Sequence, residues 1–291
     1  MAYTTEKIRN ICLLGHGGDG KTSLVESLLY MTGNTDRLGK IADGTTVCDY
    51  DPEEIKRKIS IQTTLVTLET QGYKLNILDT PGYFDFAGEV AQALRVAGCG
   101  LIVVSAKDGV NVGTEKAWRM VRGKKLPSFF YVSKIDEENS DYYTSLHKLQ
   151  KQFGVSVAPI VVPIFEGNRD TVGIVDCVIR KAYRMDGNKR VEIPIPEDMK
   201  DEAELYHQEL IEKICELDDD LMMQYLEDEG ASIPVEDLKR VLRKATCECT
   251  AVPVCCGTAY RNKGVQKLLD AIIEYMPAPT DIPSIKGTDM D

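Results

Sequence analysis

The sequence predicts an α/β fold in which a mostly parallel central sheet carries helices on both faces, with an inserted α+β subdomain. The first observation is that short apolar runs alternate with segments of helical spacing through the first half of the 291 residues. The second is that strand-like runs and then acidic helices interrupt this alternation after residue 156. The third is that an apolar strand and an apolar-faced helix follow near the end.

The first half alternates between strands and helices. Nearly continuous apolar runs predict strands at residues 11–14, 73–78, 101–105 and 128–132. Helical spacing predicts helices at residues 21–30, 89–96, 115–121 and 142–153. Residues 33–60 break the pattern because they are polar and turn-rich, and such a long loop is either functional or disordered.

The second half begins with strands and continues with helices. Several strands are expected within residues 157–184, and Asp186-Gly187-Asn188 should turn the chain into another strand at 190–193. The apolar stripe that includes Tyr206, Leu210 and Leu217 predicts the next helix. Two further helices, a strand and a last helix are expected at residues 221–226, 235–245, 252–256 and 265–276.

These segments divide the chain into two parts. We assign residues 1–156 and 251–283 to the main domain and residues 157–250 to the inserted subdomain. Prolines near residue 283 end regular structure, because proline cannot continue a helix. Residues 284–291 are expected to be a linker to further domains.

Composition argues against several classes of protein. No apolar stretch approaches the roughly 20 residues that span a membrane. A formal net charge of −11 argues against a free-standing DNA or RNA binder, because affinity for phosphate backbones comes mostly from Lys and Arg. The polar N-terminus shows no secretory signal, so the nine cysteines are expected to be reduced thiols in the cytoplasm.

A phosphate-binding loop is the most specific motif. The run from Gly15 to Thr22 matches G-x-x-x-x-G-K-[ST] and lies between an apolar strand and a helix. Glycines let backbone N–H groups converge on phosphates, and the helix N-terminus favours the same anion. Lys21 is expected to reach the outer phosphates, and the Thr22 hydroxyl to ligate Mg²⁺. We interpret His16 as a brace for the loop rather than a proton-transfer group.

Two weaker motifs follow other strands. Residues 79–82 read D-T-P-G, in which Asp79 suits the carboxylate that holds the water shell of Mg²⁺ and the Gly82 N–H could sense the γ-phosphate. Residues 133–136 read S-K-I-D where GTPases carry N-K-x-D. The Asp136 carboxylate would accept two hydrogen bonds from guanine that adenine cannot supply, and the Lys134 stem would lie along the base. Residues 257–259 (G-T-A) should place N–H groups near guanine O6.

The order, spacing and surrounding text of these motifs resemble the N-terminal GTPase domain of elongation factor G, most of all its divergent elongation factor G-like branch. The resemblance covers nearly all of the chain and includes Asp85-Phe86 after D-T-P-G and Asn262-Lys263-Gly264. It implies a P-loop GTPase fold, binding of GTP or GDP with Mg²⁺, and hydrolysis of GTP. It also implies contact with large-subunit RNA and stalk proteins of the ribosome. We expect a monomer with no membrane or DNA partner.

The resemblance completes the expected site. The catalytic residues are Lys21, Gly82 and Tyr83. The metal ligands are Thr22 and Ser60, with Asp79 acting through water. The nucleotide-binding residues are Gly15, His16, Gly17, Gly18, Asp19, Gly20, Lys21, Thr22, Ser23, Asp79, Thr80, Pro81, Gly82, Ser133, Lys134, Asp136, Gly257, Thr258 and Ala259.

Among the departures from the family's pattern, four bear directly on the expected site. Asp19 is shifted from the family's acidic position in the loop, which puts the usual contact near a monovalent cation in doubt. Ser60, in the first switch loop at residues 33–62, replaces Thr but keeps the hydroxyl that ligates Mg²⁺. Ser133 replaces Asn in the base motif. Tyr83 replaces the His that orients the attacking water.

Tyr83 leaves two interpretations open. A phenol cannot become a cation as an imidazole can, so hydrolysis is slow or triggered differently. Alternatively, Tyr83 packs against apolar neighbours and the backbone alone positions the water. Three other functions also remain open: a GTP-sensing switch with little hydrolysis, an ATP-using P-loop protein, and a ribosome-protection or release factor 3-like GTPase.

Overall fold

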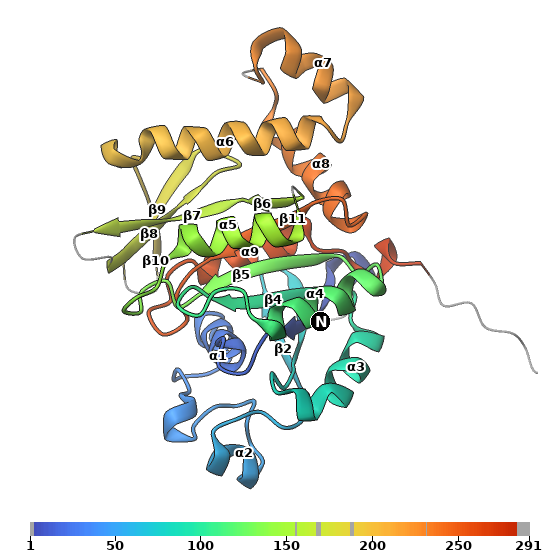
Figure 1. Cartoon of the computed structure of the whole chain (residues 1–291), viewed down its shortest axis with the longest axis vertical. Coiled ribbons are helices and arrows are strands. Elements are labelled where there is room, and N and C mark those ends of the chain that lie inside the picture. The colour runs from blue at the N-terminus through green and yellow to red at the C-terminus, as the bar shows by residue number, and fades with distance from the viewer. Residues whose placement is uncertain (1–2, 155, 167–169, 187–188, 231, 284–291) are drawn as a thin grey trace, which may run out of the picture.

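A seven-stranded sheet forms the centre of the molecule (Figure 1). The computed structural model describes residues 3–154, 156–166, 170–186, 189–230 and 232–283. The sheet order is β2-β3-β1-β4-β5-β11-β6, and every neighbouring pair is parallel except β2 with β3. The strands are β1 (Ile8–Leu14), β2 (Thr64–Thr70), β3 (Tyr73–Asp79), β4 (Cys99–Ser105), β5 (Ser128–Ser133), β6 (Val157–Pro159) and β11 (Val252–Cys256).

Helices cover both faces of this sheet, as the sequence predicts. α1 packs against α9, whereas α4 contacts β4 and α5 contacts β5 and β6. In Figure 1, α4 and α5 lie in front of the sheet and α9 lies behind it. The helices of the main domain are α1 (Lys21–Met31), α2 (Pro52–Arg57), α3 (Ala87–Val96), α4 (Val112–Gly123), α5 (Tyr142–Phe153) and α9 (Val265–Tyr275).

Burial explains why some strands are easy to predict and one is not. Every residue of β4 and β5 is buried, because helices cover both sides, and both strands are continuous apolar runs. β2 is absent from the expected elements. Its pattern only alternates, with Val66 and Leu68 buried and Leu65 61% exposed, as suits an antiparallel strand at the sheet edge.

The long loop at residues 33–60 contains short regular elements. It holds a 3₁₀ turn at Ile41–Asp43 and the helix α2. Asp51 caps α2, because its side chain accepts a hydrogen bond from the Glu53 N–H at 2.8 Å while Glu54 reaches back to the Asp51 N–H. The N-terminal proline of α2 suits the first helical turn.

A second, antiparallel sheet belongs to the inserted part of the chain. Its order is β10-β9-β8-β7, with β7 (Val161–Glu166), β8 (Asp170–Asp176), β9 (Lys181–Asp186) and β10 (Lys189–Ile193). The helices α6 (Lys200–Cys215), α7 (Asp219–Asp228) and α8 (Val235–Cys247) follow it. Figure 1 shows α7 at the opposite end of the molecule from α2.

Three expectations about this region can be compared with the structure. α6 ends at Cys215, so the expectation that Leu217 extends its apolar stripe is wrong, and that side chain is 39% exposed. The expected turn residues Gly187 and Asn188 lie outside the described residues. The boundary at residue 157 stays a prediction, although β6 pairs with β11 in the main sheet and the second sheet begins only at Val161. No helix in the described ranges is long and apolar enough to cross a membrane.

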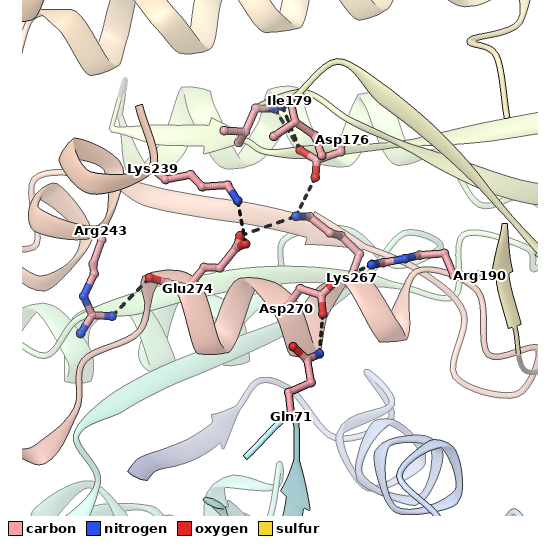
Figure 2. Close-up of polar contacts among 10 residues, drawn as sticks. Gln71, Asp176, Ile179, Arg190, Lys239, Arg243, Lys267, Asp270 and Glu274 are labelled. Atoms are coloured by element: carbon pink, nitrogen blue, oxygen red, sulfur yellow. Dashed lines mark hydrogen bonds and ion pairs between the residues drawn. The ribbon is translucent and has the colours of Figure 1, made fainter. Parts of the chain in front are cut away.

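A buried ion pair joins α9 to the second sheet (Figure 2). Lys267 Nζ lies 2.6 Å from Asp176 Oδ2 and 3.8 Å from Glu274 Oε2, and the side chains of Lys267 and Asp176 are almost fully buried. Burial by itself would lower the pKa of Lys267, but the two carboxylates outweigh it and raise that pKa. The ammonium therefore stays charged inside the protein.

Other residues of α9 extend this connection. Glu274 also accepts from Lys239 of α8 at 2.9 Å. Asp270 pairs with Arg190 of β10 and accepts from Gln71 Nε2, in the turn between β2 and β3, at 2.8 Å. α9 thus contacts the insertion and the far edge of the main sheet with its polar side chains, as Figure 2 shows.

We expect Lys267→Met to lower the free energy of unfolding by about 3–5 kcal/mol, because it leaves the Asp176 carboxylate buried without its cation. Lys239→Met is the matched control. Its partly exposed pair with Glu274 should contribute at most about 1 kcal/mol. Urea denaturation at pH 7 measures both variants, and equal losses would contradict a special role for the buried pair.

Candidate nucleotide-binding site

The predicted motifs meet at the carboxyl edge of the parallel strands. β1 ends at Leu14, β3 at Asp79, β5 at Ser133 and β11 at Cys256, and one motif begins at or directly after each of these ends. A pocket of about 250 Å³ lies at this edge. Residues from every motif-bearing loop line it, among them Gly18, Lys21, Thr22, Gly82, Lys134 and Tyr260. Segments far apart in the sequence therefore line one cavity. Its position agrees with the rule that ligands of open α/β sheets bind at the carboxyl ends of the strands.

The phosphate loop folds around the Lys21 side chain. Lys21 Nζ donates to the Gly15 carbonyl at 3.1 Å and to the His16 carbonyl at 2.8 Å. Burial lowers the pKa of Lys21, because the ammonium is removed from water. Gly20 has a φ of 96° immediately before α1, a conformation that glycine adopts without strain. The ammonium thus lies within the loop that is expected to hold phosphate.

Asp19 turns its carboxylate inward, beneath the same loop. Asp19 Oδ2 accepts the His16 N–H at 2.8 Å, and burial raises the pKa of Asp19 to about 6. The His16 ring lies 6.0 Å from the Phe84 ring, between centroids, and its Cβ lies against Gly113 of α4. These contacts agree with the interpretation of His16 as a brace for the loop.

The three expected metal residues lie together with a fourth residue, Asp49, which adds a second carboxylate. Thr22 Oγ1 donates to Asp79 Oδ2 at 2.7 Å, and Ser60 Oγ donates to Asp49 Oδ1 at 2.7 Å. The two hydroxyl oxygens lie 3.1 Å apart, close enough for either hydroxyl to donate to the other. Asp79 Oδ1 and Asp49 Oδ2 are buried and accept no hydrogen bond from the part of the chain that the structure describes.

This set of donors fits a small divalent cation. Oxygen ligands are what Mg²⁺ prefers, and Mg²⁺ keeps several waters and phosphate oxygens in its shell. Across the described residues, no group of three or more His, Cys, Asp or Glu side chains could hold a metal by itself. Burial also raises the pKa of Asp79 to about 6 and the pKa of Asp49 above its ordinary value, so a cation would offset unfavourable charge.

The base motif is tied to the phosphate loop. Ser133 Oγ donates to the Asp19 carbonyl at 2.6 Å, so this serine connects the two segments. The Lys134 side chain lines the pocket, with its ammonium 3.7 Å from Glu137 Oε1. Asp136 Oδ2 lies 3.1 Å from Arg261 Nε. The carboxylate expected to read guanine is therefore paired with a cation from the loop after β11.

Comparison with known proteins identifies the family. The family described as "Elongation factor Tu GTP binding domain" matches residues 6–278. The chain belongs to this family. It is a GTPase domain of the translation elongation factor type, and its predicted likeness to the N-terminal GTPase domain of elongation factor G is confirmed.

Curated relatives and a solved structure agree with this assignment. Elongation factor G of Thermotoga maritima is 40% identical over 285 residues, which are 97% of this chain and 41% of that protein. Elongation factor G of Thermotoga neapolitana is 41% identical with the same coverage. A crystal structure from Thermus thermophilus superposes with a TM-score of 0.89 at 37% identity, covering 95% of this chain and 41% of that one. The chain spans about two fifths of these relatives.

Two N–H groups in the loop after β11 have partners within the protein. The Gly257 N–H donates to the Val132 carbonyl of β5 at 3.1 Å, and the Thr258 N–H donates to the Lys263 carbonyl of the same loop at 2.8 Å. Of the tripeptide at residues 257–259, Ala259 is therefore the residue whose N–H best suits the expected contact with guanine O6, which stays a prediction.

Three residues of the site have no sequence motif. Asp49 reaches the metal cluster from the first switch loop, and Arg261 reaches Asp136. Tyr260 lines the pocket, and its hydroxyl accepts from Ser23 Oγ at 3.1 Å. Their only sequence signal is proximity to a recognised segment, because a single carboxylate, arginine or tyrosine in a loop indicates no specific chemistry.

We expect Asp136→Asn to weaken GDP binding by about 100-fold, because the amide cannot accept both guanine donors. The same change should improve binding of xanthosine diphosphate, whose base carries a carbonyl that the amide can donate to. Asp170→Asn is the control, since Asp170 is the other partner of Arg261 and is largely exposed. Titration with both fluorescent nucleotides measures the exchange of preference. Equal loss of both nucleotides would contradict the assignment of Asp136 to the base.

Proposed function

We propose that the chain binds GTP and GDP with Mg²⁺ in the pocket at the carboxyl edge of the main sheet and hydrolyses GTP there. One observation carries the proposal. The phosphate-loop lysine, the Thr22–Asp79 pair and the S-K-I-D motif surround the same edge of the sheet. This arrangement suits a nucleoside triphosphate whose phosphates, cation and base are recognised together.

Each motif has one role in this proposal. The N–H groups of residues 15–22 and of Ser23 at the start of α1, together with the Lys21 ammonium, bind the phosphates. Thr22 and Ser60 hold Mg²⁺, with Asp79 and Asp49 acting through its waters. The bound cation would supply neutralisation of phosphate charge.

The base contacts follow from the loops beside the phosphate site. Asp136 accepts from guanine, while Lys134 and Tyr260 flank the pocket where the base would lie. The Ala259 N–H donates to guanine O6. Arg261 must then share or release the Asp136 carboxylate, since its guanidinium occupies one oxygen.

The hydrolytic step depends on the residues after β3. Thr80 and Pro81 lead to Gly82, whose N–H would contact the γ-phosphate and order the segment that follows. Tyr83 lines the pocket at the same end. A tyrosine here also favours a second candidate function, a GTP-sensing switch with little hydrolysis, because a neutral phenol is a poor substitute for histidine.

The relatives named elongation factor G suggest the partner. We propose that the switch segments meet large-subunit ribosomal RNA and that the acidic insertion meets stalk proteins. A net charge of −11 is compatible with this because the RNA contact is local. We further propose a cytoplasmic monomer without membrane or DNA partners. The shifted Asp19 leaves no carboxylate at the family's position for a monovalent cation.

We expect these 291 residues to bind GDP and GTP but to show little stimulation of GTP turnover by ribosomes. The reason is that the chain spans only 41% of the elongation factor G relatives, whose remaining residues can add ribosome contacts. Phosphate release with and without ribosomes measures this. Strong stimulation of this chain alone would contradict it, and competition of GTP against ATP would test the base preference.

We expect Tyr83→His to raise the single-turnover rate of GTP hydrolysis at least about tenfold, because an imidazole exchanges a proton near neutral pH far more readily than a phenol does. Tyr83→Phe should stay within about twofold of the unchanged protein, since the ring rather than the hydroxyl contacts the phosphate loop. A large loss in the Phe variant would instead show that the hydroxyl positions water.

A further inference from the structure

One glycine of the phosphate loop is required by neither the motif nor the backbone. Gly15, Gly18 and Gly20 have φ values of 140°, 89° and 96°, which other residues rarely adopt. The φ of Gly17 lies outside that region, and the motif leaves position 17 free. An ordinary side chain would therefore be tolerated by the local backbone at this position. The reason for glycine must lie in a contact.

That contact is with the ring of Tyr83. A Cβ at position 17 would lie 2.8 Å from Tyr83 Cε2 and 2.9 Å from Cζ, closer than side-chain carbons approach one another. The neighbouring Gly82 is equally close to the loop, because a Cβ there would lie 2.5 Å from the Gly17 nitrogen. The segment after β3 thus rests directly on the phosphate loop, with the tyrosine ring on Gly17.

The Tyr83 ring separates two cavities. The first is the nucleotide pocket, and the second is an apolar groove of about 340 Å³ between residues 80–84 and α4. Gly82 and Tyr83 are the residues that line both. Because Gly82 has no side chain, the tyrosine ring provides the side-chain part of this wall. The Tyr83 side chain is still 42% exposed, so space exists for the ring to leave the wall.

The next residue fixes the segment in place. The Lys116 ammonium of α4 lies 3.5 Å from the centroid of the Phe84 ring, a cation–π contact that holds Phe84 against the far side of the groove. On one side, α4 holds the segment that carries Tyr83 through the contact between Lys116 and Phe84. On the other side, the Tyr83 ring packs against the Cα of Gly17.

We propose that Gly17 is a positioning residue for Tyr83 and that the ring, seated on Gly17, covers the phosphate end of the bound nucleotide. The proposal rests on the placement of nucleotide in this pocket. With the ring in place, the wall between pocket and groove is complete and a triphosphate leaves slowly. With the ring displaced, the phosphate end opens towards the groove and the nucleotide leaves faster.

The test compares Gly17→Ala, Tyr83→Ala and the double variant. The measured quantity is the dissociation rate of a fluorescent, slowly hydrolysed GTP analogue, with GDP in parallel. Each single change should speed release of the GTP analogue about three- to tenfold, the size expected for one lost aromatic contact. The double variant should release it no faster than the faster single variant, because Gly17 acts only through the ring.

One matched control and one ring-retaining variant separate this role from a general disturbance of the loop. The control is Gly88→Ala, which adds a methyl group in α3, where a Cβ would meet nothing within 4 Å, and should have no effect. Tyr83→Phe removes only the hydroxyl, and because the ring remains it should release the analogue more slowly than Tyr83→Ala does.

The outcomes are distinguishable. Unchanged release in Gly17→Ala, or a double variant whose effect is the product of the two single effects, would overturn the coupling while leaving nucleotide binding intact. Equal acceleration by Tyr83→Phe would overturn the role of the ring. Failure of the unchanged protein to bind either nucleotide would overturn the proposed site and this inference with it.

Discussion

Parallel hydrogen bonding between β1 and its two neighbours is the constraint on which the site depends. In that register Leu13 lies opposite Asp79 and Leu14 lies opposite Ile102, so the strands end at the same edge. The next pairs, β4 with β5 and β5 with β11, continue the arrangement and add Ser133 to it. Side chains separated by more than a hundred residues are placed within hydrogen-bond distance, as Ser133 and the Asp19 carbonyl are.

Several buried ionisable side chains lie at the same edge of the sheet. Burial raises the pKa of Asp19 and Asp79 and lowers that of Lys21, so each of these groups is charged at a cost in solvation. The Lys21 ammonium donates hydrogen bonds to carbonyls of the phosphate loop, and the Thr22 and Ser60 hydroxyls donate to carboxylates. A phosphate would carry charge complementary to the Lys21 ammonium, and a divalent cation would carry charge complementary to the two carboxylates.

The insertion is connected to the site through α9 and the loop before it. Arg261 bridges Asp136 in the base motif and Asp170 of β8. Farther along, Lys267 pairs with Asp176 at the end of the same strand. The second sheet is therefore held to the main domain by the exposed Arg261–Asp170 contact beside the base motif and, farther away, by the buried Lys267–Asp176 pair and the Arg190–Asp270 pair.

The sequence by itself determined the elements whose signal is local. The spacing of the phosphate loop, the continuous apolar runs of β4 and β5 and the stripe of α9 follow from short stretches of chain, because burial on both faces or one face imposes its period there. β2 was not predictable in this way, since an edge strand needs only two buried residues. Only the tertiary structure decided which distant residues are in contact. Tyr83 packs against Gly17, and Ser60 donates a hydrogen bond to Asp49. Arg261 forms an ion pair with Asp136, and Lys267 forms one with Asp176. The sequence pattern indicates whether a residue is buried or charged. Which distant residue its side chain contacts depends on the order of the strands in the sheet.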